Sequence, residues 1–156
     1  MIELEPMTEA AFASYLERAV KNYADEKVKA GNWSADEGLE RAEHDFGVLL
    51  PDGPKTVNQH LFTLQTGNEP VGMIWFAEVR TQPRPTAFIY DFWIDEAQRR
   101  QGYGREALGA LEAKVKELGL EAISLHVFGH NHTAIELYKQ AGFEITNLNM
   151  TKDLAP

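Results

Sequence analysis

The octapeptide AFIYDFWI, at residues 87–94, constrains the fold of this chain most strongly, because seven of its eight residues are apolar or aromatic. A continuous apolar run of this length predicts a strand that is covered on both faces. Apolar residues at helical spacing occur both before and after this strand, so the covering layers are available within the chain. The sequence therefore predicts an α/β protein of one domain.

The segments that precede residue 87 predict one short strand, two helices and a hairpin. Their boundaries follow from alternation in the strands, from apolar spacings of three and four in the helices, and from Pro and Gly in the loops. The predicted elements are a strand at 2–6, a helix capped by Thr8 that runs to residue 30, a second helix with the capping-box pair Ser34 and Glu37 that ends near Leu50, a loop at 51–58, and strands at 60–65 and 71–79.

The segments after residue 94 predict two more helices and two more strands. They are a helix from Gly102 to Gly119, a strand at 122–128, a helix capped by Asn131 that ends near Ala141, and a strand at 143–150. The full order is β-α-α-β-β-β-α-β-α-β. Three consecutive strands indicate an antiparallel section, and the β-α-β that follows implies a parallel pair with a right-handed crossover. We therefore expect a mixed sheet.

The stretch RRQGYGR, at residues 99–105, surrounds the predicted start of a helix at Gly102. Two closely spaced glycines allow backbone N–H groups to approach an anion, and the helix dipole adds about half a positive charge. With three arginines this predicts a diphosphate site, and the alternative is a simple turn with solvated arginines. GYGREA also fits the dinucleotide fingerprint G-x-G-x-x-A, but seven residues separate the strand from Gly102 and no acidic residue ends the next strand. A nicotinamide or other nucleotide-binding module is therefore disfavoured.

A second motif lies downstream, where residues 131–143 read NHTAIELYKQAGF. Together with R-x-x-G-x-G at 99–104, it resembles the GNAT superfamily of acetyl-CoA-dependent N-acetyltransferases. The segment IYDFWIDEAQRRQGYG is similar to the part of that family that holds coenzyme A. The resemblance covers residues 87–150, and the whole chain is similar to a small bacterial subgroup with poorly defined acceptors. It implies one N-acetyltransferase domain over 1–156, in which residues 1–58 form the acceptor-side helices and 87–150 the acetyl-CoA-binding core.

The resemblance assigns cofactor-binding roles to a strand end, to the loop after it and to Asn131. Backbone N–H groups of the loop would cradle the diphosphate, the preceding strand end would bond to the pantetheine arm through its backbone, and Asn131 would help to place the cofactor while capping its helix. The implied cofactor-binding residues are Phe92, Trp93, Ile94, Arg99, Arg100, Gln101, Gly102, Tyr103, Gly104, Arg105 and Asn131. The side chains of residues 92–94 are expected to pack in the core.

Two side chains are candidates for proton transfer. Tyr138, two helical turns after Asn131, matches the family tyrosine whose hydroxyl protonates the departing thiolate of coenzyme A, and core packing is its alternative role. Asp91, the one charged residue of its strand, is the candidate general base, with a structural hydrogen bond to a loop backbone as the alternative. Alternation places Asp91 on the face opposite Tyr90, Phe92 and Ile94. A water relay without a dedicated base also fits the family.

The implied activity is direct transfer of acetyl from acetyl-CoA to a primary amine, on a small molecule or a peptide. The alternative is a non-catalytic acyl-CoA sensor on the same fold. Early carboxylates with interspersed aromatic rings would attract a cationic acceptor, although a solvated helix face explains them too. These residues are Asp25, Glu26, Asp36, Glu37, Glu40, Glu43 and Asp45, with Tyr15, Tyr23 and Trp33 among them.

Composition argues against several other classes. The chain has no cysteine, which excludes disulfides, thiolate zinc sites and a cysteine nucleophile, and its formal net charge of −9 argues against nucleic-acid binding. His126, His130 and His132 lack a nearby ligand set, so no metal is expected. No apolar run approaches about 18 residues and the N-terminus lacks a signal-peptide layout, so we expect a cytoplasmic protein without a membrane span. Family members are often dimers, which makes a homodimer a further expectation.

Overall fold

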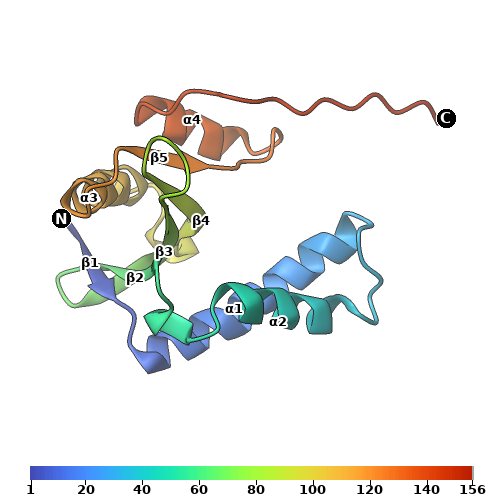
Figure 1. Ribbon diagram of the computed structural model, residues 1–156, viewed down its shortest axis with the longest axis horizontal. Coiled ribbons are helices and arrows are strands. Elements are labelled where there is room, and N and C mark those ends of the chain that lie inside the picture. The colour runs from blue at the N-terminus through green and yellow to red at the C-terminus, as the bar shows by residue number, and fades with distance from the viewer. Residues whose placement is uncertain (156) are drawn as a thin grey trace. The chain divides into compact units, whose positions relative to one another are not determined.

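The computed structural model describes residues 1–155, which form two compact units, Met1–His126 and a second unit that begins at Val127. The first unit contains a five-stranded sheet in the spatial order β1-β2-β3-β4-β5 (Figure 1). Its strands are β1 (Ile2–Pro6), β2 (Gln59–Thr66), β3 (Glu69–Val79), β4 (Thr86–Ile94) and β5 (Ala122–Leu125). The first four are antiparallel neighbours, and β5 runs parallel to β4. The predicted mixed α/β sheet is confirmed.

Three helices of the first unit flank this sheet, and two short 3₁₀ turns connect its elements. They are α1 (Glu9–Lys29), α2 (Gly38–Leu49), α3 (Tyr103–Glu117), η1 (Gly53–Lys55) and η2 (Glu96–Gln98). The predicted cap of α1 is confirmed, because Thr8 Oγ1 accepts a hydrogen bond of 3.1 Å from the Ala11 N–H. The capping-box pattern placed the start of α2 too early. Only half of the box forms, in which Glu37 Oε1 accepts from the Ser34 N–H at 3.4 Å, and the chain turns once more before the helix begins.

Different helices cover the two faces of the sheet (Figure 1). On the α1 face, Tyr15 of α1 packs in one apolar cluster with Trp75 of β3. On the α3 face, Phe62 and Phe76 are buried, and Lys114 of α3 places its Nζ 6.0 Å from the centre of the Phe62 ring. The helices α1 and α2 lie side by side, so the α1 face has a two-helix cover over part of its area.

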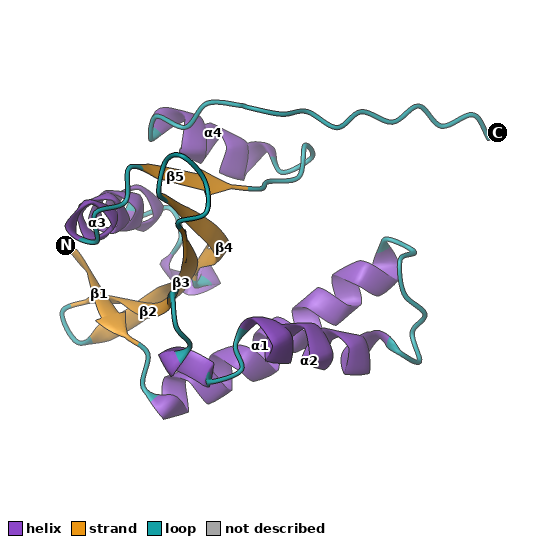
Figure 2. Cartoon of the chain, viewed as in Figure 1, coloured by secondary structure: helices purple, strands orange, loops and turns teal. Residues whose placement is uncertain are grey.

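The second unit contains α4 (His132–Gln140), and residues 141–155 after it form neither helix nor strand (Figure 2). The predicted strand at 143–150 was therefore wrong. A strand needs a neighbour for its backbone groups, and the described part of the second unit contains no strand that could pair with this segment. Its apolar side chains, which gave the alternating pattern, are largely exposed at Ile145, Leu148 and Met150.

The strand predicted at 122–128 is shorter than expected, since β5 ends at Leu125. Its ladder with β4 stops at the pair Ile89–Leu125. The next residue of β4, Tyr90, is displaced by a bulge, so the backbone groups that would continue the ladder are no longer in register. The apolar character of Val127 and Phe128 therefore did not extend the strand.

Candidate active site

β4 carries one residue more than β3 near its middle. Trp75 pairs with Asp91 and Phe76 pairs with Ile89, so Tyr90 is the extra residue of a β-bulge. In a regular strand Tyr90 and Asp91 would point to opposite faces. Here the Tyr90 ring stacks on the Trp75 ring at 4.7 Å, and both Tyr90 and Asp91 lie on the α1 face. The prediction that these two residues occupy opposite faces was therefore wrong.

The same bulge lies where the ladder between β4 and β5 ends. The parallel ladder ends at Ile89 and Leu125, whereas β4 continues to Ile94. The backbone of residues 92–94, predicted to hold the cofactor arm, thus lies beyond the ladder. The side chains of these residues are half-buried, and Trp93 packs against the apolar cluster under α1.

β3 comes very close to the end of β4 at Gly72. Gly72 is opposite Ile94 in the register, and a Cβ atom at Gly72 would meet the carbonyl oxygen of Trp93. Only a residue without a side chain permits this separation of the two backbones. Gly72 therefore helps to set the position of β4 beyond the ladder.

The loop between β4 and α3 is tied back to the end of the strand. Arg99 Nε donates a hydrogen bond of 2.9 Å to the carbonyl oxygen of Ile94. Arg100 and Gly102 both have left-handed backbone conformations, with φ angles of 66° and 82°. The Arg99 side chain thus has a structural function in the loop, and the two left-handed residues turn the chain into α3.

The N-terminus of α3, at Tyr103, differs from those of α1 and α4. Thr8 caps α1 and Asn131 caps α4 with side-chain oxygens, whereas no side chain within residues 1–155 caps α3. The N–H groups of residues 103–105 precede the first hydrogen bond within this helix. Together with the helix dipole and the exposed arginines of the loop, they form a site suited to a diphosphate.

Two hydrogen bonds hold Asp91 on the α1 face. Its Oδ2 accepts from the Tyr15 hydroxyl at 2.8 Å, and its Oδ1 accepts from the Phe92 N–H at 3.1 Å. Burial raises the pKa of Asp91, and the hydrogen bonds from Tyr15 and Phe92 reduce this rise. Burial, and then the neighbouring Asp91 carboxylate, raises the pKa of Tyr15, which stays a neutral hydrogen-bond donor.

Arg18 lies close to Tyr15 and Asp91. Among the ion pairs of residues 1–155, none joins Arg18 to Asp91. Its guanidinium carbon lies 4.2 Å from the centre of the Trp93 ring. The charge of Arg18 lowers the pKa of Asp91 and that of Glu26 raises it, and both effects are smaller than that of burial. A half-buried carboxylate with a raised pKa and no cation in contact is a stronger base than an exposed aspartate, which suits it to accept a proton.

The aromatic side chains predicted near the acceptor separate into two places. Tyr15 lies at the β4 site, whereas Tyr23 and Trp33 pack edge to face at 5.5 Å near the end of α1. Two cations of the chain lie over the Trp33 ring, with Lys27 Nζ at 5.9 Å and the Arg41 guanidinium carbon at 5.2 Å from its centre. These contacts stabilise the connection between α1 and α2, and they already use the Trp33 ring.

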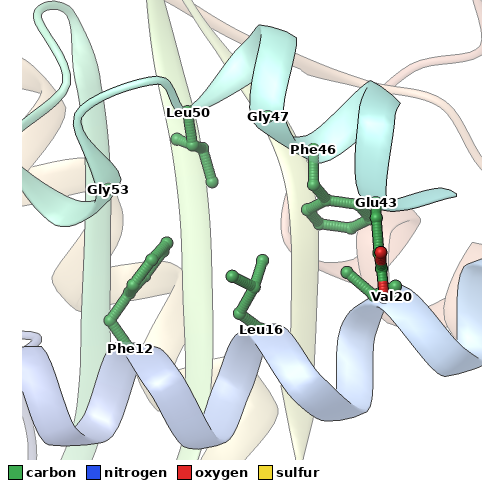
Figure 3. Close-up of a pocket in the computed structure, with 8 residues that line it drawn as sticks. All are labelled: Phe12, Leu16, Val20, Glu43, Phe46, Gly47, Leu50 and Gly53. Atoms are coloured by element: carbon green, nitrogen blue, oxygen red, sulfur yellow. The ribbon is translucent and has the colours of Figure 1, made fainter. Parts of the chain in front are cut away.

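The predicted carboxylates are dispersed too. Glu37 pairs with Arg41, and Asp45 acts on Tyr23, whose pKa is raised by burial and then by this carboxylate. Glu43 borders an apolar furrow of about 220 Å³ between α1 and α2 (Figure 3). The furrow is lined by Phe12, Leu16, Val20, Glu43, Phe46, Gly47, Leu50 and Gly53. No residue of β4 lines this furrow. The cluster of carboxylates in the sequence therefore did not predict the position of the Asp91 site.

The second unit carries the two remaining predicted residues. Asn131 Oδ1 accepts a hydrogen bond of 3.2 Å from the Ala134 N–H, so its predicted role as the cap of α4 is confirmed. Tyr138 is half-buried on the same helix, and its ring makes an edge contact with Phe143 at 5.5 Å. The proton-donor role of Tyr138 and a cofactor contact of Asn131 stay predictions.

His126 follows β5, while His130 and His132 flank the cap of α4. Within the part of the chain that the structure describes, no group of three or more His, Asp or Glu side chains could hold a metal ion. No helix in that part is long and apolar enough to cross a membrane.

Tyr15 and Gly72 were not predicted in the roles that the structure gives them. A lone carboxylate in an apolar strand needs a hydrogen-bond donor, and a tyrosine in the buried stripe of a helix was the available signal for Tyr15. An isolated glycine inside the strand VGMIWFAEV was the signal for a close approach of two backbones. Neither signal identifies its partner, because the pairing depends on how α1, β3 and β4 pack.

A mixed sheet in which β4 continues beyond its parallel ladder with β5 and leads to an uncapped helix N-terminus defines the class, an α/β acetyltransferase fold. The chain belongs to the acetyltransferase (GNAT) family, which matches residues 15–143. It is similar to two uncharacterized N-acetyltransferases of Bacillus subtilis (strain 168). YycN is 42% identical over 154 residues, covering 98% of this chain and 99% of YycN, and YdgE is 35% identical over 152 residues, covering 97% of each.

The solved structure of YycN has a TM-score of 0.90 to this chain at 41% identity, with 100% of both chains covered. The predicted family and fold class are therefore confirmed.

Proposed function

We propose that this protein transfers the acetyl group of acetyl-CoA to a primary amine by direct attack. The observation that carries the proposal is the stretch of β4 that continues beyond its ladder with β5 and leads to the uncapped start of α3. Coenzyme A has an anionic diphosphate, which suits the N–H groups of residues 103–105, and an extended amide-containing arm, which suits the backbone of residues 92–94. When bound, acetyl-CoA supplies an acetyl group activated as a thioester.

We assign the diphosphate to the loop and the first turn of α3. Backbone N–H groups would provide most of the hydrogen bonds, while the exposed guanidinium groups of Arg100 and Arg105 add positive charge. Arg99 supports the loop through its bond to Ile94. The residues assigned to the cofactor are Phe92, Trp93, Ile94, Arg99, Arg100, Gln101, Gly102, Tyr103, Gly104, Arg105 and Asn131.

Asp91 is the proposed general base. As the amine nitrogen attacks the thioester carbon, a C–N bond forms, the C–S bond breaks, and one amine proton passes to Asp91, directly or through a water molecule. Tyr15 and the Phe92 N–H hold the carboxylate in place. Asp91 then returns this proton to solvent, which leaves the residue ready for the next turnover.

Tyr138 is the proposed general acid. Its hydroxyl would donate a proton to the departing sulfur, so the free thiol leaves and the tyrosine regains a proton from solvent. The support for this role is the family motif, together with the half-buried position of the ring on α4. Replacing Tyr138 with Phe should slow turnover and leave the affinity for acetyl-CoA nearly unchanged.

Thermal unfolding with acetyl-CoA, coenzyme A, NADH and ATP tests the cofactor assignment. A ligand at about 100 times its dissociation constant adds roughly 2.7 kcal/mol to the free energy of unfolding, which corresponds to about 5–10 °C for a domain of this size. A shift with the two coenzyme A compounds supports the proposal. A shift with NADH or ATP alone would contradict it.

Thiol release measured over a panel of primary amines then tests the transfer. Release that depends on both acetyl-CoA and an amine supports an enzyme. If acetyl-CoA binds but no amine causes thiol release, the acyl-CoA sensor would be the supported function and the enzyme would be contradicted.

A further inference from the structure

The bulge in β4 exposes an aromatic ring directly beside the proposed base. Tyr90 precedes Asp91 in sequence and shares its face of the sheet. It lies in the middle of a strand whose apolar composition predicts burial on both faces, yet 43% of its surface is exposed. Neither the core nor the assigned cofactor contacts account for this exposed ring.

The Tyr90 ring is supported from within the sheet. It stacks on Trp75 with 4.7 Å between ring centres and 22° between ring planes, and Phe88 meets it edge to face at 5.1 Å. Trp75 is only 2% exposed, and its Nε1 donates a hydrogen bond of 2.7 Å to Gln59 Oε1. The exposed ring is therefore held by neighbours that are themselves fixed, so a ligand that stacks on it would lose little side-chain entropy from the protein.

We propose that Tyr90, backed by Trp75 and Phe88, is the docking platform for the acceptor, and that the acceptor is an arylalkylamine, a primary amine joined to a flat aromatic body by a short alkyl spacer. The proposal rests on the acetyl transfer proposed above and names the substrate class for that site. The aromatic body stacks on Tyr90 while the amine reaches Asp91.

The spacing of the two residues supports this class. The α-carbons of adjacent residues are about 3.8 Å apart, so the ring and the carboxylate act on parts of one small molecule. An aromatic body gains stacking on an exposed ring, whereas a polyhydroxylated amine would lose hydration there without finding hydrogen bonds. The charges of Asp91 and of Glu26 on α1 complement an ammonium group during its approach.

The platform also continues the transfer site along the strand. Ile89, the last residue of the β4–β5 ladder, lies immediately before Tyr90, and residues 92–94, assigned to the cofactor arm, follow Asp91. The acceptor body, the base and the reacting carbon would therefore be aligned along one short stretch of β4.

Steady-state kinetics with 2-phenylethylamine, butylamine and spermidine test the platform. We expect 2-phenylethylamine to have the highest kcat/KM of the three. In Tyr90→Ala, the KM for 2-phenylethylamine should rise about tenfold, with kcat, the KM for butylamine and the KM for acetyl-CoA unchanged. Tyr90→Phe keeps the ring and should retain the wild-type KM.

Leu39→Ala is the matched control, because Leu39 is a large apolar residue of α2 that is 53% exposed. It should leave all three amines unaffected. The proposal is overturned if Tyr90→Ala raises the KM for butylamine as much as that for 2-phenylethylamine, or raises the KM for acetyl-CoA instead. A wild-type preference for spermidine or butylamine would also overturn it.

Failure of the platform and failure of acetyl transfer give different results. Turnover of butylamine with no dependence on the ring contradicts the platform alone. If no amine is acetylated, calorimetric titration of 2-phenylethylamine into wild type and Tyr90→Ala decides the question. Equal affinities, or no binding to either, would overturn the platform, while weaker binding to the variant would support it without transfer.

Discussion

Glu78 on β3 and Asp91 on β4 are half-buried carboxylates on opposite faces of the same sheet. On the α3 face, Glu78 Oε2 lies 2.6 Å from His60 Nε2, and its Oε1 accepts from Arg80 Nε at 2.9 Å. On the α1 face, Asp91 has a phenol and a backbone N–H as its donors. One carboxylate is thus paired with charged or chargeable nitrogens, and the other with neutral donors.

The pKa values of the two carboxylates move in opposite directions as a result. Burial alone would raise the pKa of Glu78, but the hydrogen bonds from His60 and Arg80 outweigh it and hold the pKa below its ordinary value. At Asp91 burial outweighs the hydrogen bonds and the pKa is raised. The difference shows how to separate a structural carboxylate from a reactive one, because a raised pKa makes a carboxylate a better proton acceptor and a lowered pKa makes it a poorer one.

Packing around the two residues agrees with this distinction. His60 stacks on Phe76 at 4.8 Å, and Arg80 donates to the carbonyl oxygen of Leu118 at 2.9 Å, so the Glu78 cluster ties β2, β3 and the end of α3 together. Asp91 instead adjoins the exposed ring of Tyr90 and the end of the β4–β5 ladder. The first cluster stabilises the fold, and the second faces the place where ligands are proposed to meet.

Replacing Asp91 with Asn should have the largest effect on activity. Loss of the general base lowers kcat by about 10²–10³-fold. Stability should not fall at neutral pH, because the raised pKa of Asp91 means that its charged form costs stability above the ordinary value of 3.8. That cost is absent below the ordinary pKa and complete above the folded pKa, so the stability of the Asp91→Asn variant relative to wild type should increase as pH rises through this interval.

Glu78→Gln is the matched control, since it makes the same carboxylate-to-amide change on the other face. Turnover assays and thermal unfolding over a pH series measure both effects. Wild-type turnover in Asp91→Asn would show that Asp91 has a structural role and that the amine loses its proton to water.

Replacing Gly72 with Ala should move the strand that carries Asp91 without changing any charge. Its Cβ atom would meet the carbonyl oxygen of Trp93, so β3 and β4 must separate locally. We expect the free energy of unfolding to fall by about 1–3 kcal/mol and the affinity for acetyl-CoA to weaken. Gly109→Ala, on α3 with open space around it, is the control, and it should be neutral or slightly stabilising. Unchanged stability and affinity in Gly72→Ala would contradict the positioning role.

Glu78→Gln should lower stability by about 1–2 kcal/mol at neutral pH and leave kcat unchanged, because the charge-assisted bonds to His60 and Arg80 are weakened. The folded pKa of Glu78 is depressed, so its contribution is present above the ordinary value of 4.5 and is lost as pH falls through the folded pKa. The stability difference between wild type and variant should therefore shrink in acid. Glu117→Gln changes an exposed carboxylate on α3 and should have almost no effect. A fall in kcat with Glu78→Gln would contradict the assignment of Glu78 to a purely structural role.

Much of the fold was predictable because its signals are local. The apolar run at 87–94, the cap at Thr8 and the helical stripe after Gly102 each specify an element within a few residues. The strand predicted at 143–150 was wrong because a strand also depends on residues outside the local pattern. Alternation describes a surface that is suited to pairing, but pairing also requires a neighbouring strand, and a local pattern does not provide one.

The candidate site was predictable only where a motif carries it. R-x-x-G-x-G located the start of α3, and the apolar strand made Asp91 conspicuous. The bulge at Tyr90 left no local signal, because one extra residue in an apolar run changes neither its composition nor its length in a recognisable way. Because of this extra residue, Tyr90 and Asp91 lie on the same face of the sheet. The residues after the bulge therefore occupy the faces opposite to those predicted by alternation counted from the residues before it.

Tyr15→Phe should have the smallest effect on activity. It tests most directly whether the hydrogen-bond donors of Asp91 set the pKa of that carboxylate. The Tyr15 hydroxyl lowers the pKa of Asp91, so its removal should raise that pKa further and leave the carboxylate with fewer donors. The acid limb of the pH profile of kcat/KM should then move to higher pH. On that limb activity should fall by about two- to tenfold, and at high pH it should approach the wild-type value, because Asp91 is deprotonated there in both proteins. Tyr23→Phe removes a hydroxyl near Asp45, away from β4, and should leave the profile in place. A reduction that is uniform at all pH values would show that Tyr15 acts by packing, and a limb that moves to lower pH would show that the Asp91 carboxylate does not control it.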